Sequence, residues 1–153
     1  MQKEVKIVSA EVAAHAHATE DLEKVKRAML NVLPEDLRAK LKSRIDVQKL
    51  EGHHGNPIHR LTLRLSGEEA SSLLRFIISS LSEGERTLME LIVKNRYDKK
   101  RGRLFLRLSK QDAYLGRIRL LEGDDVLRVT VTFRGSPSPT LVASLLKEMG
   151  STK

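Results

Sequence analysis

Arginine and lysine side chains crowd one part of this sequence, between residues 94 and 119. This segment holds ten basic residues and two acidic ones, an excess equal to the formal net charge of +8 of the whole 153-residue chain. The charge of the remaining residues is therefore balanced. An excess of base confined to one segment is typical of a binding site for a polyanion, and nucleic acid is the commonest polyanion.

Arginines alternate with apolar residues in four stretches, which predicts strands over 58–65, 103–108, 116–120 and 127–134. Successive residues of a strand point to opposite faces, so these arginines share the face away from the leucines and valines. No acid occurs at these outward positions, and like charges side by side on a sheet are destabilising until a polyanion neutralises them. The outward arginines are Arg60, Arg64, Arg103, Arg107, Arg117, Arg119, Arg128 and Arg134.

The nucleic acid expected on this face is RNA, and DNA is not expected. The helix predicted over 20–33 mixes acids with bases, unlike a DNA recognition helix, and the zinc-finger pattern is absent. An open basic sheet with a basic loop suits contacts to RNA phosphates and RNA shape. Phe105 lies between two of the arginines, where its ring could stack on a base.

The five histidines allow a different hypothesis, a metal-dependent hydrolase acting on RNA. His15 and His17 would share a face of an extended segment, and His53 or His54 could complete a three-nitrogen metal site. The sequence has no HExxH motif and no Asp-rich magnesium motif, so we favour a protein without catalytic activity, bound metal or other cofactor. The loop from Gly52 to Pro57 could instead direct histidine and backbone donors toward phosphate.

The elements that must position these residues indicate an α+β fold. Apolar periodicity predicts further strands over 4–14 and 45–50, and helices over 20–33, 35–42, 67–81 and about 139–150, while 88–93 fits either a helix or a strand. Helices with one apolar face each predict a two-layer sandwich, a mostly antiparallel curved sheet with helices packed on one face. Residues 1–153 are expected to form a single domain.

Composition narrows the class of protein further. There is no cysteine, no apolar run long enough to span a bilayer and no apolar signal core at the start of the sequence. These features predict a cytoplasmic protein with no membrane partner.

Three segments of the sequence resemble an archaeal family of small RNA-binding proteins whose members are described as predicted exosome-associated subunits. The segments are His17-Ala18-Thr19-Glu20-Asp21 with Lys24-Val25, Gly52-His53-His54-Gly55-Asn56-Pro57-Ile58, and Leu106-Arg107-Leu108-Ser109-Lys110-Gln111-Asp112-Ala113-Tyr114-Leu115-Gly116. The resemblance implies a fold similar to the large-subunit ribosomal protein that contacts 5S rRNA. It also implies a role with RNA and no catalytic activity.

The leading hypothesis is therefore a non-enzymatic RNA-binding protein, with exosome or ribosome-associated proteins as further candidate partners. Arginines of the sheet face would grip phosphates, Lys99, Lys100 and Arg101 would form a flexible basic flap, and Lys110 and Gln111 would contact RNA near a strand end. His53, His54 and Asn56 are secondary candidates. A third hypothesis is a scaffold whose basic face meets an acidic protein.

Overall fold

The computed structural model describes residues 5–52 and 55–151, and it contains one sheet and a layer of helices. The strands are β1 (Ile7–Ala16), β2 (Asp46–Glu51), β3 (Pro57–Ser66), β4 (Tyr97–Asp98), β5 (Arg103–Ser109) and β6 (Val126–Phe133). The α-helices are α1 (Leu22–Asn31), α2 (Glu35–Leu41), α3 (Gly67–Ser80), α4 (Glu83–Arg86), α5 (Met89–Arg96), α6 (Lys110–Tyr114) and α7 (Pro139–Ser151). A short 3-10 helix, Lys42–Arg44, follows α2.

The six strands form one antiparallel sheet in the order β2-β3-β1-β6-β5-β4. The first strand of the chain thus lies at the centre, between two long strands from different halves of the sequence. β1 pairs Val12 with Leu63 of β3 and with Val129 of β6, and all three side chains are fully buried. This central register fixes which residues of every strand face the helices.

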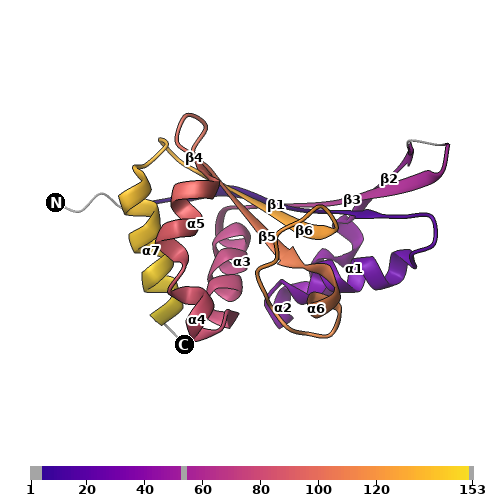
Figure 1. Cartoon of the computed structure of the whole chain (residues 1–153), viewed down its shortest axis with the longest axis horizontal. Helices are drawn as coiled ribbons and strands as arrows, with labels where there is room; N and C mark the ends of the chain where they lie inside the picture. The colour runs from indigo at the N-terminus through magenta and orange to yellow at the C-terminus, as the bar shows by residue number, and fades with distance from the viewer. Residues whose placement is uncertain (1–4, 53–54, 152–153) are drawn as a thin grey trace.

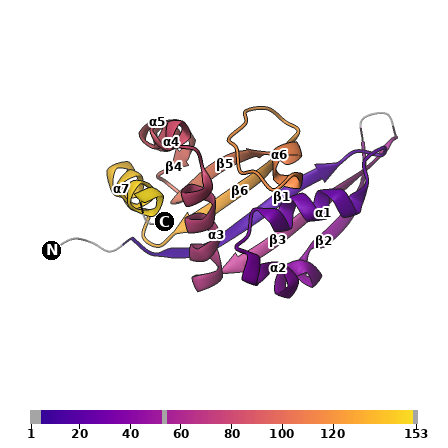
Figure 2. The same cartoon turned by 90° about the horizontal axis from the view of Figure 1, so that it is seen from below.

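All the helices lie on one side of the sheet, as Figure 1 shows. Seen from that side in Figure 2, α1, α2 and α6 cover one end of the sheet, α4, α5 and α7 cover the other, and α3 crosses between them. The buried apolar side chains of strands and helices form one continuous core. None of the described helices lies on the opposite side of the sheet, so the side chains there are free to meet a partner.

The expected α+β fold, an antiparallel sheet with helices on one face, is confirmed. The ambiguous stretch 88–93 is helical, within α5. Among the described residues, none of the helices has both the length and the apolar character needed to cross a bilayer.

The strand expected over 116–120 does not form, which is a correction. Gly116 takes φ +84° and ends α6, its N–H donating to the Ala113 carbonyl and the Arg117 N–H to the Asp112 carbonyl. This pair of bonds is a Schellman motif, which directs the chain out of the helix. Only Leu120 then forms a single bridge, to Leu108 on the edge of β5.

Candidate nucleic-acid interface

The helix-free face of the sheet, called here the open face, displays arginines from three strands. The leucines and valines of β3, β5 and β6 are buried against the helices, so the intervening residues of those strands point outward. Arg60 and Arg64 of β3 and Arg103, Phe105 and Arg107 of β5 lie on this face, as the alternation predicts. Arg128 of β6 lies there too. A hollow of about 550 Å³ crosses the face.

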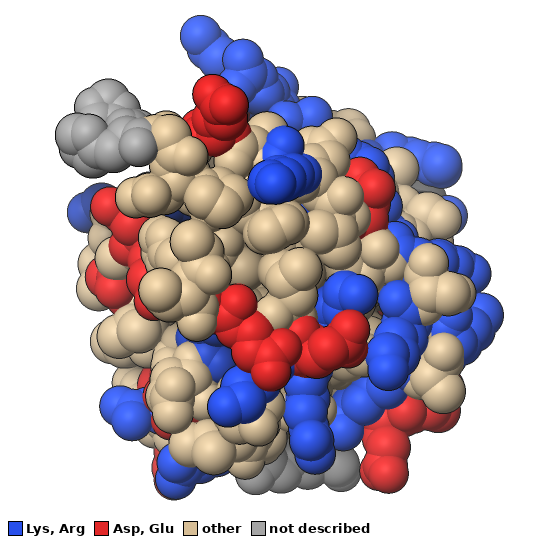
Figure 3. Space-filling model, turned by 90° about the vertical axis from the view of Figure 1, so that its right-hand side faces the viewer, with Lys and Arg blue, Asp and Glu red and all other residues tan. Residues whose placement is uncertain are grey.

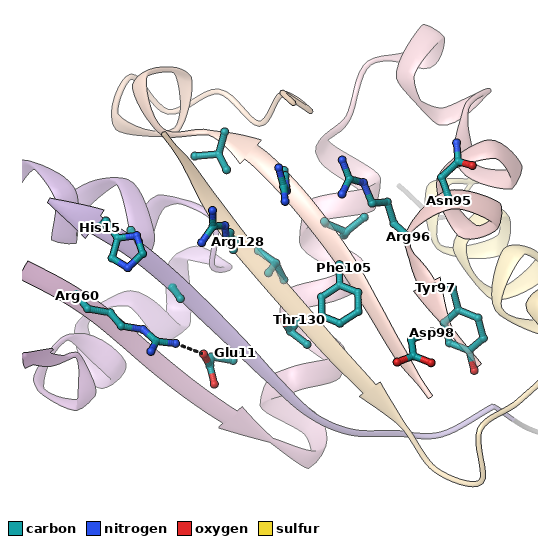
Figure 4. Close-up of a pocket in the computed structure, with 16 residues that line it drawn as sticks. Glu11, His15, Arg60, Asn95, Arg96, Tyr97, Asp98, Phe105, Arg128 and Thr130 are labelled. Atoms are coloured by element: carbon teal, nitrogen blue, oxygen red, sulfur yellow. Dashed lines mark ion pairs between the residues drawn. The ribbon is translucent and has the colours of Figure 1, made fainter. Parts of the chain in front are cut away.

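Three of these arginines, Arg60, Arg128 and Arg107, form a line across the sheet that we call the basic row. Arg107 lies directly opposite Arg128 in the β5–β6 pairing. On the other side of Arg128 is β1, where Ala13 pairs with Arg128 and His15 pairs with Arg60. Figure 4 shows Arg60, His15 and Arg128 around the hollow. Neighbouring strands lie about 4.8 Å apart, so the row places three guanidinium groups within reach of one short polyanion segment.

The basic row is only loosely neutralised by the protein. Arg60 lies 3.9 Å from Glu11, and Arg128 lies 3.9 Å from the exposed Asp124. Arg107 donates to the Gly123 carbonyl at 2.8 Å, and within the described residues the buried Nε of Arg128 has no hydrogen-bond partner. Exposed ion pairs at such distances contribute little, so the guanidinium groups remain available to an outside anion.

His15 lies inside this cationic environment, which disfavours its own protonation. Its partial burial, followed by the charges of Arg128 and Arg60, lowers the pKa of the imidazole below 6.5. The histidine is thus neutral at pH 7 but sits where a bound anion would favour its charged form.

Acids also lie on the open face, which corrects the expectation of an acid-free surface. Glu11 of β1 lies 3.6 Å from Arg64, Asp98 of β4 pairs directly opposite Arg103, and Asp46 of β2 lies on the same face by its pairing with β3. The alternation of the arginine-rich strands could not show them, because they come from strands without arginine. The positive charge of the open face is therefore partly balanced beside Arg64 and Arg103.

The basic segment Lys99–Arg101 is a tight hairpin turn rather than a free flap. The Lys100 N–H donates to the Asp98 carboxylate at 3.0 Å, and the Gly102 carbonyl accepts from the Phe133 N–H at 2.8 Å. Gly102 itself has φ +64°, and a side chain at this position would contact the Phe133 carbonyl. All three basic side chains are exposed, so the turn presents fixed charge at one end of the molecule.

Lys110 is not displayed at the surface but buried at the start of α6. Its ammonium donates to the His15 carbonyl at 2.9 Å and to both oxygens of Glu20 at 3.0 and 3.1 Å, and it lies 2.6 Å from Asp125. We call Lys110, Glu20 and Asp125 the Lys110 cluster. Because these partners already hold the ammonium, its geometry is that of a structural tie between β1, α6 and the start of β6.

Gln111 is exposed beside a second groove, of about 550 Å³, between α1 and α6. Lys24 and Arg27 of α1 lie 5.8 and 5.9 Å from the centre of the Tyr114 ring in this region. Asn31 donates to the Ala113 carbonyl at 2.9 Å and holds α6 against α1. Sequence periodicity could not reveal this group of residues, because they come from two helices, α1 and α6, that are far apart in the sequence.

The remaining candidates lie apart from the basic row. Arg117 and Arg119 are exposed in the loop after α6, where Arg117 lies 3.6 Å from Asp112 and the Arg119 carbonyl accepts from the Ser109 N–H. Asn56 is exposed at the β2–β3 connection and uses its carbonyl to bond Gly52 at 2.6 Å. His53 and His54 lie outside the described residues.

His15 and His17 of the hydrolase hypothesis lie at the end of β1 and just beyond it. His15 lies on the open face, whereas His17 follows the strand and lies 3.9 Å from Asp125. Among the described residues, His17, Glu20 and Asp125 have potential ligand atoms within 4.8 Å of one another. Both carboxylates already contact the Lys110 ammonium, whose positive charge opposes a metal cation there.

The surface charge at the β2–β3 end of the molecule is uneven. Figure 3 shows lysines and arginines gathered along one side of this view and at its top, with a band of acidic side chains across the lower centre. A polyanion approaching this end therefore meets attraction along one side only.

Comparison with known protein families gives a match over most of the chain. Residues 9–133 match the model of a family described as RNA binding. A protein of Pyrococcus abyssi named as an RNA-binding protein is 32% identical over 124 residues, covering 79% of this chain and 78% of the relative. An uncharacterized protein of Methanocaldococcus jannaschii is 31% identical over 126 residues, covering 82% of this chain and 84% of the relative.

Solved structures agree in fold. A crystal structure from Archaeoglobus fulgidus, described with the family model DUF54, has a TM-score of 0.73 and 29% identity, covering 94% of this chain and 99% of the other. A DUF54 protein from Methanothermobacter thermautotrophicus has a TM-score of 0.69 and 26% identity, with coverage of 94% and 98%.

Proposed function

The chain belongs to the RNA-binding family that its residues 9–133 match, and we propose that it binds RNA, without catalysing a reaction, through the open face of its sheet. The observation that carries this proposal is the basic row. Arg107 and Arg128 lie directly opposite each other on an uncovered surface, and Arg60 lies on the far side of β1; among the described residues, their partners are carboxylates at 3.9 Å and a main-chain carbonyl.

The chemistry of the basic row suits RNA phosphates. A guanidinium group binds phosphate oxygens in pairs and stacks on bases, and its charge persists at every physiological pH. Arg107 and Arg128 are directly opposite across two strands, a placement that is destabilising in the free protein. A bound phosphate chain would relieve this repulsion and release its own counterions.

A double substitution tests the proposal. Arg107→Ala with Arg128→Ala should weaken RNA binding roughly 150-fold at about 0.1 M salt, since each charge-assisted hydrogen bond contributes about 1.5 kcal/mol. The slope of log affinity against log salt should flatten by about 1.4, the value for two lost single-strand phosphate contacts. Thermal stability should hold or rise, because two opposed charges are removed.

The matched control is Arg75→Ala with Lys42→Ala, which removes the same charge from the helix side of the molecule, where both side chains are exposed. RNA affinity measured by fluorescence anisotropy should change less than threefold in the control. An equal loss of RNA affinity in the two double variants would show that only net charge matters. Unchanged affinity in the Arg107→Ala, Arg128→Ala variant would reject the proposal.

The absence of catalysis is a separate part of the proposal. It is supported by the engagement with the Lys110 ammonium of Glu20 and Asp125, the carboxylates that lie near His17 among the described residues. Incubation of labelled RNA with the purified protein and added Mg²⁺ or Mn²⁺ tests it. We expect intact RNA, and cleavage that disappears in Glu20→Gln would restore the hydrolase hypothesis.

Association with the archaeal exosome stays a prediction from the family resemblance, and binding to an acidic protein stays a prediction from the basic face. Neither the family description nor the names of the relatives mention a complex. Co-purification from cells with and without nuclease treatment separates the possibilities. A protein partner that survives nuclease treatment would indicate direct protein binding, and one that is lost would indicate that RNA bridges the two.

A further inference from the structure

An apolar groove lies beside the open face, between α5 and the segment that follows α6. It has a volume of about 500 Å³, and its walls are formed by Leu88, Leu91 and Ile92 on one side and by Leu120 and Leu121 on the other. Leu88, Leu91 and Leu121 are 45%, 53% and 48% exposed. Large apolar side chains gathered at one exposed groove are typical of a ligand or partner site.

This groove is continuous with the hollow that holds the basic row. Asn95, Arg96, Phe105 and Arg107 line both of them. Figure 4 shows Asn95 and Arg96 on the α5 side and Phe105 on the sheet, with Arg128 beyond it. A polyanion chain seated on Arg128 and Arg107 therefore reaches Phe105 and the mouth of the groove without leaving the surface.

The chemistry of this junction suits a nucleobase. A base has flat apolar faces and a polar edge, and the groove offers the Phe105 ring and leucine side chains for the faces. The Asn95 amide both donates and accepts hydrogen bonds, which suits a base edge, and Arg107 lies where the attached phosphate would be. An apolar peptide would leave Arg107 without a counter-charge, since its guanidinium bonds the neutral Gly123 carbonyl, whereas Arg96 already pairs with Glu122, which also lines the groove.

The accessibility of the bases indicates whether the bound RNA is single-stranded or double-stranded. In a duplex the bases are stacked and paired, and an A-form helix presents phosphates and 2′-hydroxyls rather than base faces. Only an unpaired nucleotide can turn its base into a groove beside the phosphate track. We therefore infer that this face binds single-stranded RNA and that the groove between α5 and residues 120–122 accepts an unstacked base against Phe105, Leu91 and Leu121. This inference rests on the proposed RNA-binding function of the open face.

Three oligonucleotides of equal length separate base recognition from phosphate recognition: an unstructured single strand, the same backbone with abasic positions, and a duplex. Base stacking on protein side chains is worth about 5- to 100-fold in affinity per base. The wild-type protein should therefore bind the intact single strand at least about fivefold more tightly than the abasic strand or the duplex.

Variants of the groove should remove that preference. Leu91→Ser, Leu121→Ser and the conservative Phe105→Leu should each weaken binding of the intact strand while leaving the abasic strand within about twofold. Leu91 and Leu121 are about half exposed, so their substitution leaves the core in place. Leu115→Ser is the matched control, since Leu115 is 54% exposed and lines neither the groove nor the hollow.

The outcomes distinguish this inference from the function on which it rests. Equal affinity for intact and abasic strands, tighter binding of the duplex, or equal loss on both strands in the groove variants would overturn the inference. In each of these cases RNA binding through the basic row would stand. Failure of the wild-type protein to bind any of the three would reject the proposed function together with the inference. Groove variants that leave RNA affinity unchanged and abolish binding of a co-purified protein would assign the groove to that protein instead.

Discussion

The basic row and the Lys110 cluster are two basic regions of one molecule that hold their charge in opposite ways. In the Lys110 cluster, one ammonium group contacts two carboxylates and a carbonyl at 2.6–3.1 Å. In the basic row, Arg60 and Arg128 reach carboxylates only at 3.9 Å, and Arg107 bonds a carbonyl. A basic residue is thus available to a partner only where the fold leaves it without close acids.

The difference arises from acids that are far away along the chain. Glu20 is 90 residues from Lys110, yet it supplies two of the hydrogen bonds to the ammonium. Glu11 lies on the neighbouring strand β1, 3.9 Å from Arg60 and 3.6 Å from Arg64, so its carboxylate forms a close ion pair with neither arginine. Counting charge along the sequence therefore overestimates the positive charge that the Lys110 cluster offers to a partner and underestimates the charge that the basic row offers.

The largest expected effect distinguishes the two regions by stability. Lys110→Met leaves Glu20 and Asp125 without their shared cation and should cost about 2–3 kcal/mol in unfolding free energy. For a chain of this size the melting temperature should fall by roughly 5–10 °C. Calorimetry measures this change, and anisotropy on the folded variant should show RNA affinity within about twofold of wild type.

Lys99→Met is the matched control, because Lys99 is exposed on the turn after β4. It should leave the melting temperature within about 1 °C and weaken RNA binding if the turn contacts phosphate. A stable Lys110→Met variant that loses RNA affinity tenfold would show that the ammonium contacts RNA after all.

A smaller effect should follow from removing an acid that lies beside the basic row on the open face. Glu11→Gln keeps the shape of the side chain and removes a charge that attracts Arg60 and Arg64 and repels phosphate. RNA affinity should rise about three- to fivefold at low salt, and the gain should shrink as salt increases. Titrations at two salt concentrations measure it, and a loss of affinity would contradict an RNA site beside Glu11.

The smallest expected effect is a pH dependence carried by His15. Burial, with the charges of Arg128 and Arg60, lowers the pKa of His15 from 6.5. Its contribution to stability is therefore complete above pH 6.5 and is lost as the pH falls through the lowered value, because the unfolded chain takes up the proton first. RNA affinity should change in the opposite direction, rising about two- to threefold on acidification, since phosphate stabilises the charged imidazole.

His15→Gln should flatten both profiles in that range, whereas His17→Gln, which removes only a lesser cause of the lowered pKa of His15, should change them less. Melting curves and anisotropy across pH 5.5–7.5 measure the two trends. Stability and affinity that move in the same direction would contradict the placement of His15 beside a phosphate site.

Much of the fold could be predicted from the sequence because its signals are local. Alternation of leucine with arginine identified β3 and β5, and apolar spacing identified α3 and α7. The pleat then placed Arg107 and Arg128 on one face without any knowledge of strand order. Their direct opposition depended on the pairing of β5 with β6, which a single strand pattern does not contain.

The rest of the site could not be predicted, because it depends on contacts between distant segments. The alternation of Arg117 and Arg119 with apolar neighbours imitates a strand, but Gly116 ends the preceding helix in a way that prevents one. The position of Glu11 beside Arg60 and Arg64 follows from the pairing of β1 with β3, and the burial of Lys110 follows from the approach of Glu20. Neither the pairing of these strands nor the contact between Glu20 and Lys110 can be predicted from the pattern of apolar residues.

The irregular segment after Gly116 also affects how the molecule behaves at high concentration. The outer edge of β5 is covered by the two-residue β4 at one end and by the main chain of Arg119 and Leu121 at the other. The opposite edge of the sheet, β2, is short and carries charged and polar residues, including Asp46 and Lys49. Neither edge offers a long apolar strand to another chain, and such edges resist the edge-to-edge pairing that leads to aggregation. The loop that keeps Arg119 out of the sheet thus also covers part of one sheet edge. It thereby protects a protein with one uncovered sheet face from edge-to-edge aggregation.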